Sequence, residues 1–322
     1  MKYLISLISL IFLAGCMVGP NYKQPKTPTP KIFTEAKESK NISLKNWWEK
    51  FDDPVLNKLV QTALKGNFDV KIATERILQY RALYRIARAD LFPQVDANAK
   101  AIRSKVSESL VFSPFLGTTI QNFFEVGFDA VWELDFFGKI RREKEAAMYA
   151  TDVQIEEKKD IELSLLAEIT RLYVDIRYFQ TKIALFEKRK DVEKDILTFY
   201  QDRFHSGIDS IIVQEIATAN FQNISSEIPL LQESLKQNFY ALVSLLGKDP
   251  EHLSLSSLKK GPIPQIKGKV FAPMPSALLR RRPDIRRAEK EEQKRFMKEY
   301  NKKQSVDKIL FKDLFGDMFD KK

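Results

Sequence analysis

Cysteine, histidine and glycine are scarce in this 322-residue chain, and their scarcity excludes several classes of protein. The chain contains one Cys, two His and 11 Gly. A single Cys cannot form an internal disulfide, so packing and assembly must stabilise the fold. His205 and His252 are far apart in the sequence, and no Cys, Asp or Glu cluster has metal-ligand spacing. We therefore expect no metal site and no cofactor. No phosphate loop, nucleophile elbow or Ser-His-Asp set is present, which predicts that the protein is not an enzyme.

The positive charge is concentrated at the end of the chain. The net charge is +10, and positions 280–322 hold 15 Lys or Arg against 9 Asp or Glu, which accounts for +6 of it. Arg280-Arg281-Arg282 is compatible with a nucleic-acid patch or with surface charge at the start of a helix, and the nearly balanced body of the chain favours the second. We expect no nucleic-acid partner.

Cys16 follows a short apolar segment that begins after Lys2. Residues 1–15 have the basic start, apolar run and small final residues of a cleaved signal peptide. Leu13-Ala14-Gly15-Cys16 resembles a bacterial lipobox, in which the Cys is acylated and becomes the first mature residue, as in palmitate-bearing lipoproteins. Met17, in place of Asp, favours sorting to the outer membrane by the same resemblance. The alternative is an ordinary signal peptide with a chance cysteine.

A proline-rich tether and two helical pieces come next. Residues 16–45 are rich in proline and polar residues, which favours an extended, lipid-anchored tether. Asp53 followed by Pro54 is typical of a helix N-terminus. Apolar residues then recur at helical spacing, are interrupted at Gly66-Asn67, and resume until Phe92-Pro93.

The apolar period changes to two over about 94–135, which predicts two β-strands. Apolar side chains in the second strand alternate with Glu125, Asp129 and Glu133. The apolar positions are Phe124, Val126, Phe128, Ala130, Trp132 and Leu134. Such a strand fits either a transmembrane barrel, with one face toward lipid and one toward the lumen, or a half-buried soluble sheet. The pattern by itself leaves both open.

A long helical hairpin is predicted over about 139–247. Residues 139–204 lack proline and would span ~100 Å as one helix. Apolar residues from Ile161 to Phe186 step by three and four, and a second seam runs from Val213 to Leu246. The turn between them contains Gly207, whose backbone freedom permits the reversal.

Six motifs in order carry a resemblance to a known family. They are Leu13-Ala14-Gly15-Cys16 with Val18-Gly19-Pro20-Asn21-Tyr22; Trp47-Trp48 with Phe51-Asp52-Asp53-Pro54-Val55-Leu56; Ala87 to Pro93; Trp132 to Arg142; Ala241 to Gly247; and Arg281 to Arg286. Together they resemble the outer-membrane efflux lipoproteins of the TolC type, in the OprM-like or NodT-like branch. This resemblance implies a TolC-like fold, mainly α with a β-hairpin, in which long antiparallel helical hairpins continue the strands of a transmembrane β-barrel.

The resemblance also implies location, partners and roles. It implies a homotrimer in the outer membrane that extends into the periplasm, exports drugs or other small molecules, and works with a periplasmic adaptor protein and an inner-membrane pump. Glu125, Asp129 and Glu133 would face the lumen. The turn residues Arg203, Phe204, Gly207 and Ser210 would form the tip on which the adaptor docks, although a plain structural reversal explains the turn equally simply.

The end of the chain departs from the family pattern. Residues 46–270 correspond to a first repeat, and residues 271–322 begin a second repeat but continue into a polar run that we expect to be poor in helix. The chain as given would therefore supply two strands where the family supplies four. We expect a barrel that does not close and an inactive or poorly assembled form. The alternative function is a non-channel periplasmic lipoprotein, either a scaffold or a decayed remnant.

Overall fold

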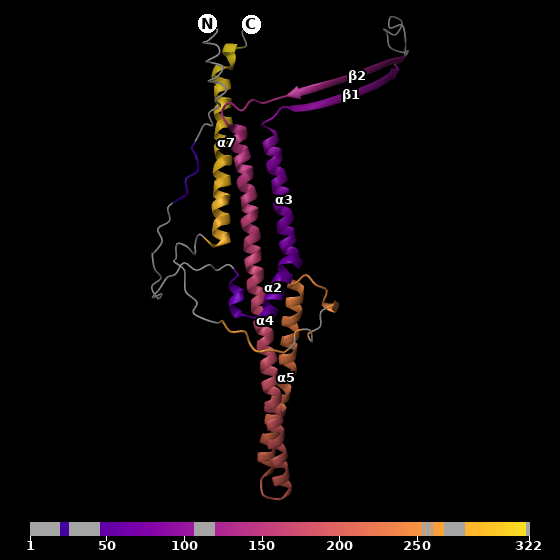
Figure 1. Cartoon of the computed structure of the whole chain (residues 1–322), viewed down its shortest axis with the longest axis vertical. Helices are drawn as coiled ribbons and strands as arrows, with labels where there is room; N and C mark the ends of the chain where they lie inside the picture. The colour runs from indigo at the N-terminus through magenta and orange to yellow at the C-terminus, as the bar shows by residue number, and fades with distance from the viewer. Residues whose placement is uncertain are drawn as a thin grey trace. The chain divides into compact units, whose positions relative to one another are not determined.

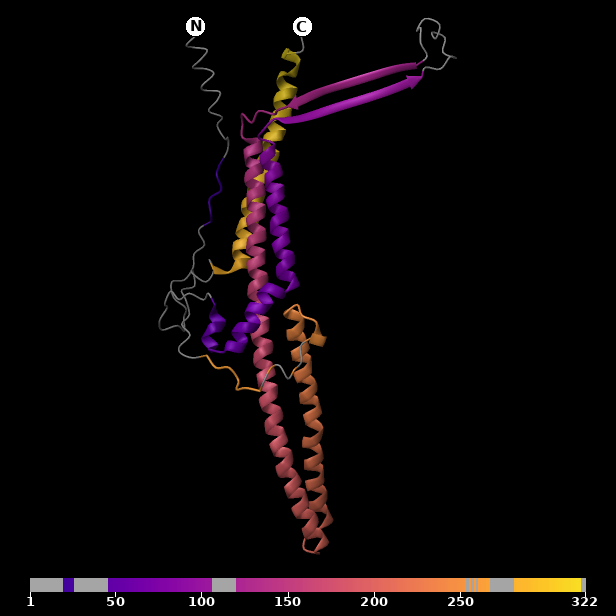
Figure 2. The same cartoon turned by 45° about the vertical axis from the view of Figure 1, so that its right-hand side comes forward.

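The computed structural model describes residues 20–25, 46–105, 120–252, 255, 258, 260–266 and 281–319, with side chains described as far as residue 302. Long helices and one two-stranded ribbon dominate Figures 1 and 2. The elements in chain order are η1 (Trp47–Phe51), α2 (Pro54–Gly66), α3 (Phe68–Ala89), β1 (Gln94–Lys105), β2 (Ile120–Val131), α4 (Lys139–His205), α5 (Ile211–Leu245), η3 (Pro250–His252) and α7 (Pro283–Phe319). The predicted class, mainly α with a β-hairpin, is confirmed.

The chain divides into two compact units, which we describe separately. The hairpin unit comprises Lys26–Ile77 and Gln154–Arg287, and the strand unit comprises Met1–Pro25, Leu78–Val153 and Ala288–Lys322.

Two side-chain caps organise the start of the hairpin unit. Asp53 Oδ1 accepts hydrogen bonds from the backbone N–H groups of Val55 at 2.8 Å and Leu56 at 3.2 Å, and Pro54 occupies the first helical position. Asn67 separates α2 from α3, and its Oδ1 accepts from the N–H groups of Asp69 and Val70 at 2.9 and 3.2 Å. Both caps satisfy backbone donors that a helix start leaves without partners. The predicted helix start and the predicted break at Gly66-Asn67 are confirmed.

The core of the hairpin unit is the seam between α4 and α5, closed at one end by α2. One buried cluster unites side chains from all three helices. Its members include Leu165, Ile169, Leu172, Ile176 and Ile183 from α4, Leu231, Leu235, Phe239 and Leu242 from α5, and Leu56 and Val60 from α2. These α4 and α5 residues belong to the two predicted seams, so the antiparallel helical hairpin is confirmed.

In the strand unit, β1 and β2 form one antiparallel ribbon. The register runs from Gln94 opposite Val131 to Lys105 opposite Ile120. The prediction that the second strand continues to about residue 135 was wrong, because β2 ends at Val131. The chain turns there: Trp132 Nε1 donates to the Leu91 carbonyl at 3.2 Å, and Asp135 caps α4 instead of continuing the strand.

Helix α3 also ends earlier than predicted, at Ala89 rather than at Phe92-Pro93. The N–H of Leu91 bonds to the Arg88 carbonyl and that of Phe92 to the Ala89 carbonyl, at 3.2 and 2.9 Å. These tighter turns end the helix because the residue before a proline avoids helical dihedrals.

Helix α7 runs antiparallel to the first part of α4. Within the strand unit, Lys290 Nζ lies 3.2 Å from Asp152 Oδ2 and above the ring of Tyr149, and Asn301 Nδ2 donates to the Lys139 carbonyl at 3.1 Å. Later residues of α7 thus contact earlier residues of α4, so the two helices run in opposite directions. In Figures 1 and 2 the two helices lie side by side.

The polar run after Asn301 is helical as far as Phe319. The expectation of a helix-poor end was therefore wrong for residues 301–319. This stretch contains no proline and a single Gly316, while its Lys, Gln and Leu residues have good helix propensity. Among the helices of the described residues, none combines the length and apolarity required to cross a membrane.

Candidate functional site

The lipidation prediction lies outside the described residues. Cys16, the signal peptide at 1–15 and most of the tether at 16–45 fall there, so acylation of Cys16 stays a prediction. The first described residues after the cysteine are Pro20 to Pro25, which have no helix or strand.

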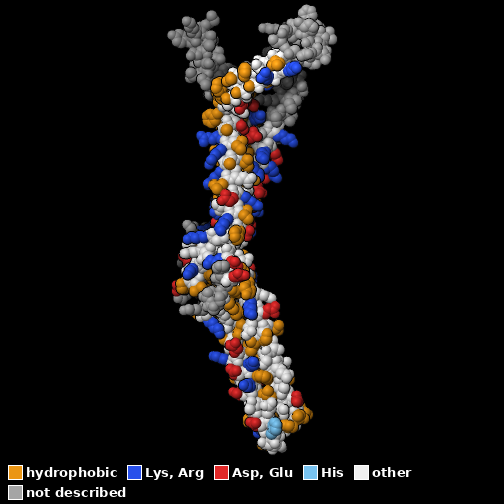
Figure 3. All heavy atoms as spheres, turned by 90° about the vertical axis from the view of Figure 1, so that its right-hand side faces the viewer, with side chains coloured by type: hydrophobic (Ala, Val, Ile, Leu, Met, Phe, Trp, Pro, Cys, Tyr) orange, Lys and Arg blue, Asp and Glu red, His pale blue; other side chains and the backbone are white. Residues whose placement is uncertain are grey.

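The β1–β2 ribbon carries an unpacked apolar face. Register and alternation place eight side chains on this apolar face: Val95, Ala97, Ala99, Ala101, Phe124, Val126, Phe128 and Ala130. Three of the side chains contributed by β2, those of Phe124, Val126 and Phe128, are 77, 81 and 79% exposed. Figure 3 shows apolar side chains gathered on the ribbon. Burying each large side chain against lipid or protein would be favourable by ~1.5–3 kcal/mol.

The opposite face of the ribbon is polar along most of its length. Asp129 lies opposite Asp96 and accepts a 2.7 Å hydrogen bond from Asn98 Nδ2, while Glu125 lies opposite Lys100. Glu125 and Asp129 therefore share a face, as alternation predicted. Whether this face lines a lumen stays a prediction.

Glu133 does not belong to the polar face, because β2 ends two residues before it. Its Oε1 lies 3.6 Å from Lys139 Nζ at the start of α4. Strand alternation therefore gives no orientation for Glu133, and its lumen-facing role stays a prediction that rests on the resemblance alone.

Sequence reasoning also missed an apolar pair on the polar face. Phe123 lies opposite Ile102, on the same side of the ribbon as Glu125, and these two side chains are 54 and 38% exposed. At this end of the ribbon both faces are therefore apolar, since Phe124 and Ala101 pair on the other side. The two consecutive phenylalanines in the sequence were the available signal.

The tip of the helical hairpin, Arg203 to Ser210, is closed by an ion pair and a glycine. Arg203 Nε and Nη2 donate to the carboxylate of Asp209 at 2.5 and 3.3 Å. This hydrogen bond lowers the pKa of the Asp209 carboxyl and raises the pKa of the Arg203 guanidinium. Gly207 has φ +72°, the left-handed backbone predicted for the reversal. Of the other predicted docking residues, Phe204 is half-buried and Ser210 is exposed.

Exposed isoleucines lie on and just after the tip: Ile208 falls within the predicted turn but was not singled out, and Ile212 and Ile216 lie beyond it. Ile208, Ile212 and Ile216 are 62, 67 and 58% exposed. Apolar side chains gather beside the pale-blue histidine of the turn in Figure 3. The predicted seams identified buried positions only, so these outward-facing residues on and just after the turn were not selected.

A hydrogen-bonded network joins α2 to α4 within the hairpin unit. The hydroxyl of Tyr173 donates to Asp53 Oδ2 at 2.7 Å and accepts from Arg177 Nη2 at 2.9 Å. Arg177 Nη1 donates to Gln180 Oε1 at 3.0 Å. Burial, followed by the hydrogen bond to Asp53, raises the pKa of Tyr173 to about 12. The carboxylate of Asp53 thus caps α2 and at the same time attaches that cap to α4.

The ends of α2 and α5 meet at two glycines. A Cβ atom added to Gly66 would lie 2.4 Å from the Leu246 carbonyl oxygen, and one added to Gly247 would lie 2.4 Å from the Gly66 carbonyl oxygen. Asn67 Nδ2 donates to the Leu245 carbonyl at 3.0 Å beside this contact. We call this the glycine contact. It fixes the break between α2 and α3 against the end of α5.

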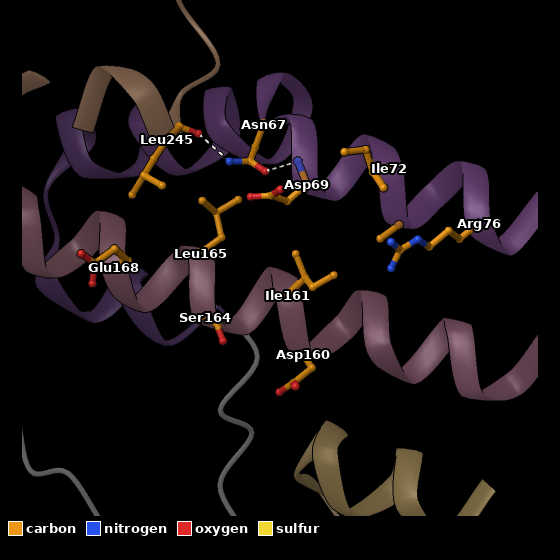
Figure 4. Close-up of a pocket in the computed structure, with 11 residues that line it drawn as sticks. Asn67, Asp69, Ile72, Arg76, Asp160, Ile161, Ser164, Leu165, Glu168 and Leu245 are labelled. Carbon is orange, nitrogen blue, oxygen red and sulfur yellow. Dashed lines mark hydrogen bonds between the residues drawn. The ribbon is translucent and has the colours of Figure 1, made fainter. Parts of the chain in front are cut away.

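A surface hollow of about 540 Å³ lies between α3 and α4 next to Leu245 (Figure 4). Its lining is Asn67, Asp69, Ile72, Ala73, Arg76, Asp160, Ile161, Ser164, Leu165, Glu168 and Leu245. No histidine or cysteine is part of this lining. Among the described residues no group of His, Cys, Asp and Glu could hold a metal ion.

The chain resembles known proteins over most of its length. The family model described as "Outer membrane efflux protein" matches residues 59–248. "Nodulation protein T" of Rhizobium leguminosarum bv. trifolii is 28% identical over 292 residues, covering 90% of this chain and 61% of that protein. "Solvent efflux pump outer membrane protein SrpC" of Pseudomonas putida is 30% identical over 295 residues, covering 88% of this chain and 62% of that protein.

A solved structure has the same fold. The outer-membrane channel OprN aligns with a TM-score of 0.75 at 30% sequence identity, over 88% of this chain and 63% of that one. The chain therefore spans about three fifths of the length of the relatives that it matches.

Proposed function

The chain belongs to the outer membrane efflux protein family, and from this membership we propose that it is the outer-membrane channel component of a tripartite efflux system. In this role the protein is a passive conduit for drugs or other small molecules. It works with a periplasmic adaptor protein and an inner-membrane pump, and it assembles as a homotrimer.

The exposed apolar face of the ribbon is the observation that carries this proposal. A two-stranded ribbon is marginal in water, and this one leaves Phe124, Val126 and Phe128 almost fully accessible. In a barrel wall, these side chains would face lipid while Glu125 and Asp129 face the lumen. The charged lumen face would then admit polar and ionic solutes and select among them by charge.

The tip supports a docking role in the same proposal. The Arg203–Asp209 ion pair and the left-handed Gly207 hold the turn in one shape, which reduces the entropy lost on binding. Phe204, Ser210 and the exposed Ile208 provide a mixed polar and apolar surface for an adaptor. The competing explanation, a purely structural reversal, does not require those exposed isoleucines.

Acylation of Cys16 supplies the second membrane attachment. The acyl chains would partition into the bilayer with ~0.8 kcal/mol per buried methylene. The protein is then lipid-anchored in the outer membrane and extends into the periplasm through α4 and α5.

Complementation in a drug-sensitive strain that lacks its own channel tests the proposal. A working channel should restore resistance and give a detergent-resistant oligomer in outer-membrane fractions, whereas the inactive, poorly assembled form expected from two strands should give neither. A monomer that delipidation releases from the membrane, with no resistance, would instead support a non-channel lipoprotein scaffold.

Site-specific photocrosslinking tests the docking surface. Crosslinkers at Phe204, Ile208 and Ser210 should capture the adaptor, and the matched control is exposed Leu185 on α4, outside the tip. Capture at Leu185 without capture at the three tip positions would refute docking at the tip while leaving the channel proposal intact.

A further inference from the structure

Arg142, near the start of α4, is a buried cation whose partners come from three parts of the chain. Its side chain is 1% exposed. Nη1 donates to Glu145 Oε2 at 2.8 Å and to Met297 Sδ of α7 at 3.6 Å, and Nη2 donates to Asn21 Oδ1 at 3.1 Å. The guanidinium also lies 6.0 Å from the centre of the Tyr300 ring. Removing a charge from water costs several kcal/mol, so this site is stable only while its partners remain in place.

The Asn21 partner is separated from Arg142 by 121 positions and belongs to a segment without helix or strand. The next residue contacts α7: the ring of Tyr22 meets that of Phe296 edge-on, with centroids 5.9 Å apart. Burial, followed by the charges of Glu289 and Glu292, raises the pKa of Tyr22. Two consecutive residues of this segment therefore contact helices, one through a hydrogen bond and one through an aromatic ring.

We infer that Arg142 and the facing side of α7 form a docking site for the segment Pro20–Pro25, which holds the chain that follows Cys16 against the start of α4. Asn21 supplies the hydrogen-bond acceptor for the buried guanidinium, and Tyr22 supplies the apolar contact. Arg142 is a positioning residue in this site, because it acts on the anchor through Asn21.

The docking site limits where the lipid anchor can lie. Asn21 is five residues from Cys16, and an extended chain of five residues reaches at most about 18 Å. Asn21 therefore keeps Cys16 within that distance of the Arg142 site, which lies just after the end of β2. If Cys16 is acylated, as the proposed function holds, the lipid lies within about 18 Å of Asn21 along the chain.

Trypsin cleavage after Lys23 measures the docking directly in membranes that contain the full chain. Lys23 is exposed, but a protease must bind the neighbouring residues in extended form, and docked Asn21 and Tyr22 are not free to enter its site. Asn21→Ala and Arg142→Gln should each raise the cleavage rate roughly tenfold, as expected from the loss of a hydrogen bond to a charged group. Arg171→Gln, which removes an exposed arginine paired with Glu168, is the matched control and should leave the rate unchanged.

The double variant separates docking from general loosening of the helices. If Asn21 and Arg142 act on each other, Asn21→Ala with Arg142→Gln should cleave no faster than the faster single variant. Asn21→Asp should keep the protection, because a carboxylate still accepts from the guanidinium. Wild-type cleavage in Asn21→Ala, or independent multiplication of the two effects, would overturn the inference and assign Arg142 to the packing of α4 against α7.

Two different measurements test acylation of Cys16 and docking of the segment Pro20–Pro25, so each can be refuted without the other. Labelling of Cys16 with a fatty-acid analogue reports acylation, and cleavage after Lys23 reports docking. Loss of labelling with Lys23 still protected would refute the anchor of the proposed function and leave the docking site standing. Normal labelling with equal cleavage in wild type and Asn21→Ala would refute the docking site only.

Discussion

Substitution of Gly247 by alanine should strongly destabilise the helical hairpin. Gly247 has φ +63°, and a Cβ there would lie 2.4 Å from the Gly66 carbonyl oxygen and 2.8 Å from its carbonyl carbon. Ordinary van der Waals contacts between such atoms lie near ~3.5 Å. The obstacle is backbone from α2 rather than the end of a flexible side chain, so local rearrangement cannot relieve it.

The size of the effect follows from two separable contributions. A left-handed backbone costs a non-glycine residue ~1–2 kcal/mol, and overpacking in a tight contact costs ~1–3 kcal/mol. We therefore expect Gly247→Ala to lower the free energy of unfolding by ~2–5 kcal/mol. Two control variants separate the backbone cost from the overpacking cost. Gly207→Ala has the left-handed backbone but nothing within 4 Å of its Cβ, and Gly127→Ala in β2 has open space and no positive φ.

Chemical denaturation of the purified protein in detergent, followed by far-ultraviolet circular dichroism, gives the three free energies. We expect Gly247→Ala to be the least stable, Gly207→Ala to lose only the backbone contribution of ~1–2 kcal/mol, and Gly127→Ala to stay near wild type. Equal midpoints for Gly247→Ala and Gly207→Ala would refute the clash. A midpoint for Gly247→Ala equal to that of Gly127→Ala would refute both contributions.

Three further changes test the anchor, the strand faces and the tip. Cys16→Ser should leave an unlipidated precursor, visible as lost fatty-acid labelling and altered gel mobility, and normal anchoring would count against acylation. Phe128→Arg should make the free energy of membrane insertion less favourable by ~2–4 kcal/mol if residue 128 lies near the midplane of the bilayer. Asp129→Arg should be tolerated. Equal insertion of the two variants would contradict the assigned faces. The Asp209 carboxyl has a lowered pKa, so its pairing with Arg203 stabilises the tip above the ordinary Asp pKa and is lost as the pH falls through the lowered value. Hydrogen-exchange protection factors at the turn, which correct for the intrinsic pH dependence of exchange, should therefore fall in acid in wild type but stay constant in Asp209→Asn.

Local chemistry made much of this fold predictable. The Asp53-Pro54 helix start, the break at Asn67 and the left-handed Gly207 each depend on residues that are adjacent in sequence. The two helical seams depend only on a spacing of three and four residues, which a long helix preserves. The alternation that placed Glu125 and Asp129 on one face depends only on the period of a strand.

Predictions were less accurate where local signals conflict with their surroundings. Glu133 continues the alternation of β2 in sequence, but Trp132 bonds back to Leu91 and ends the strand first. A contact with a distant part of the chain therefore decides where the strand ends.

The sequence by itself determined the elements and their faces, because helix period, strand period and caps are encoded within a few residues. Only the tertiary structure decided which distant segments meet. Asn21 contacts Arg142 across 121 positions, and Asn67 contacts Leu245 across 178. No local pattern specifies such pairs, since they depend on how the long helices lie against one another. Contacts of this kind hold the break between α2 and α3 against the end of α5, and the segment after Cys16 against α4.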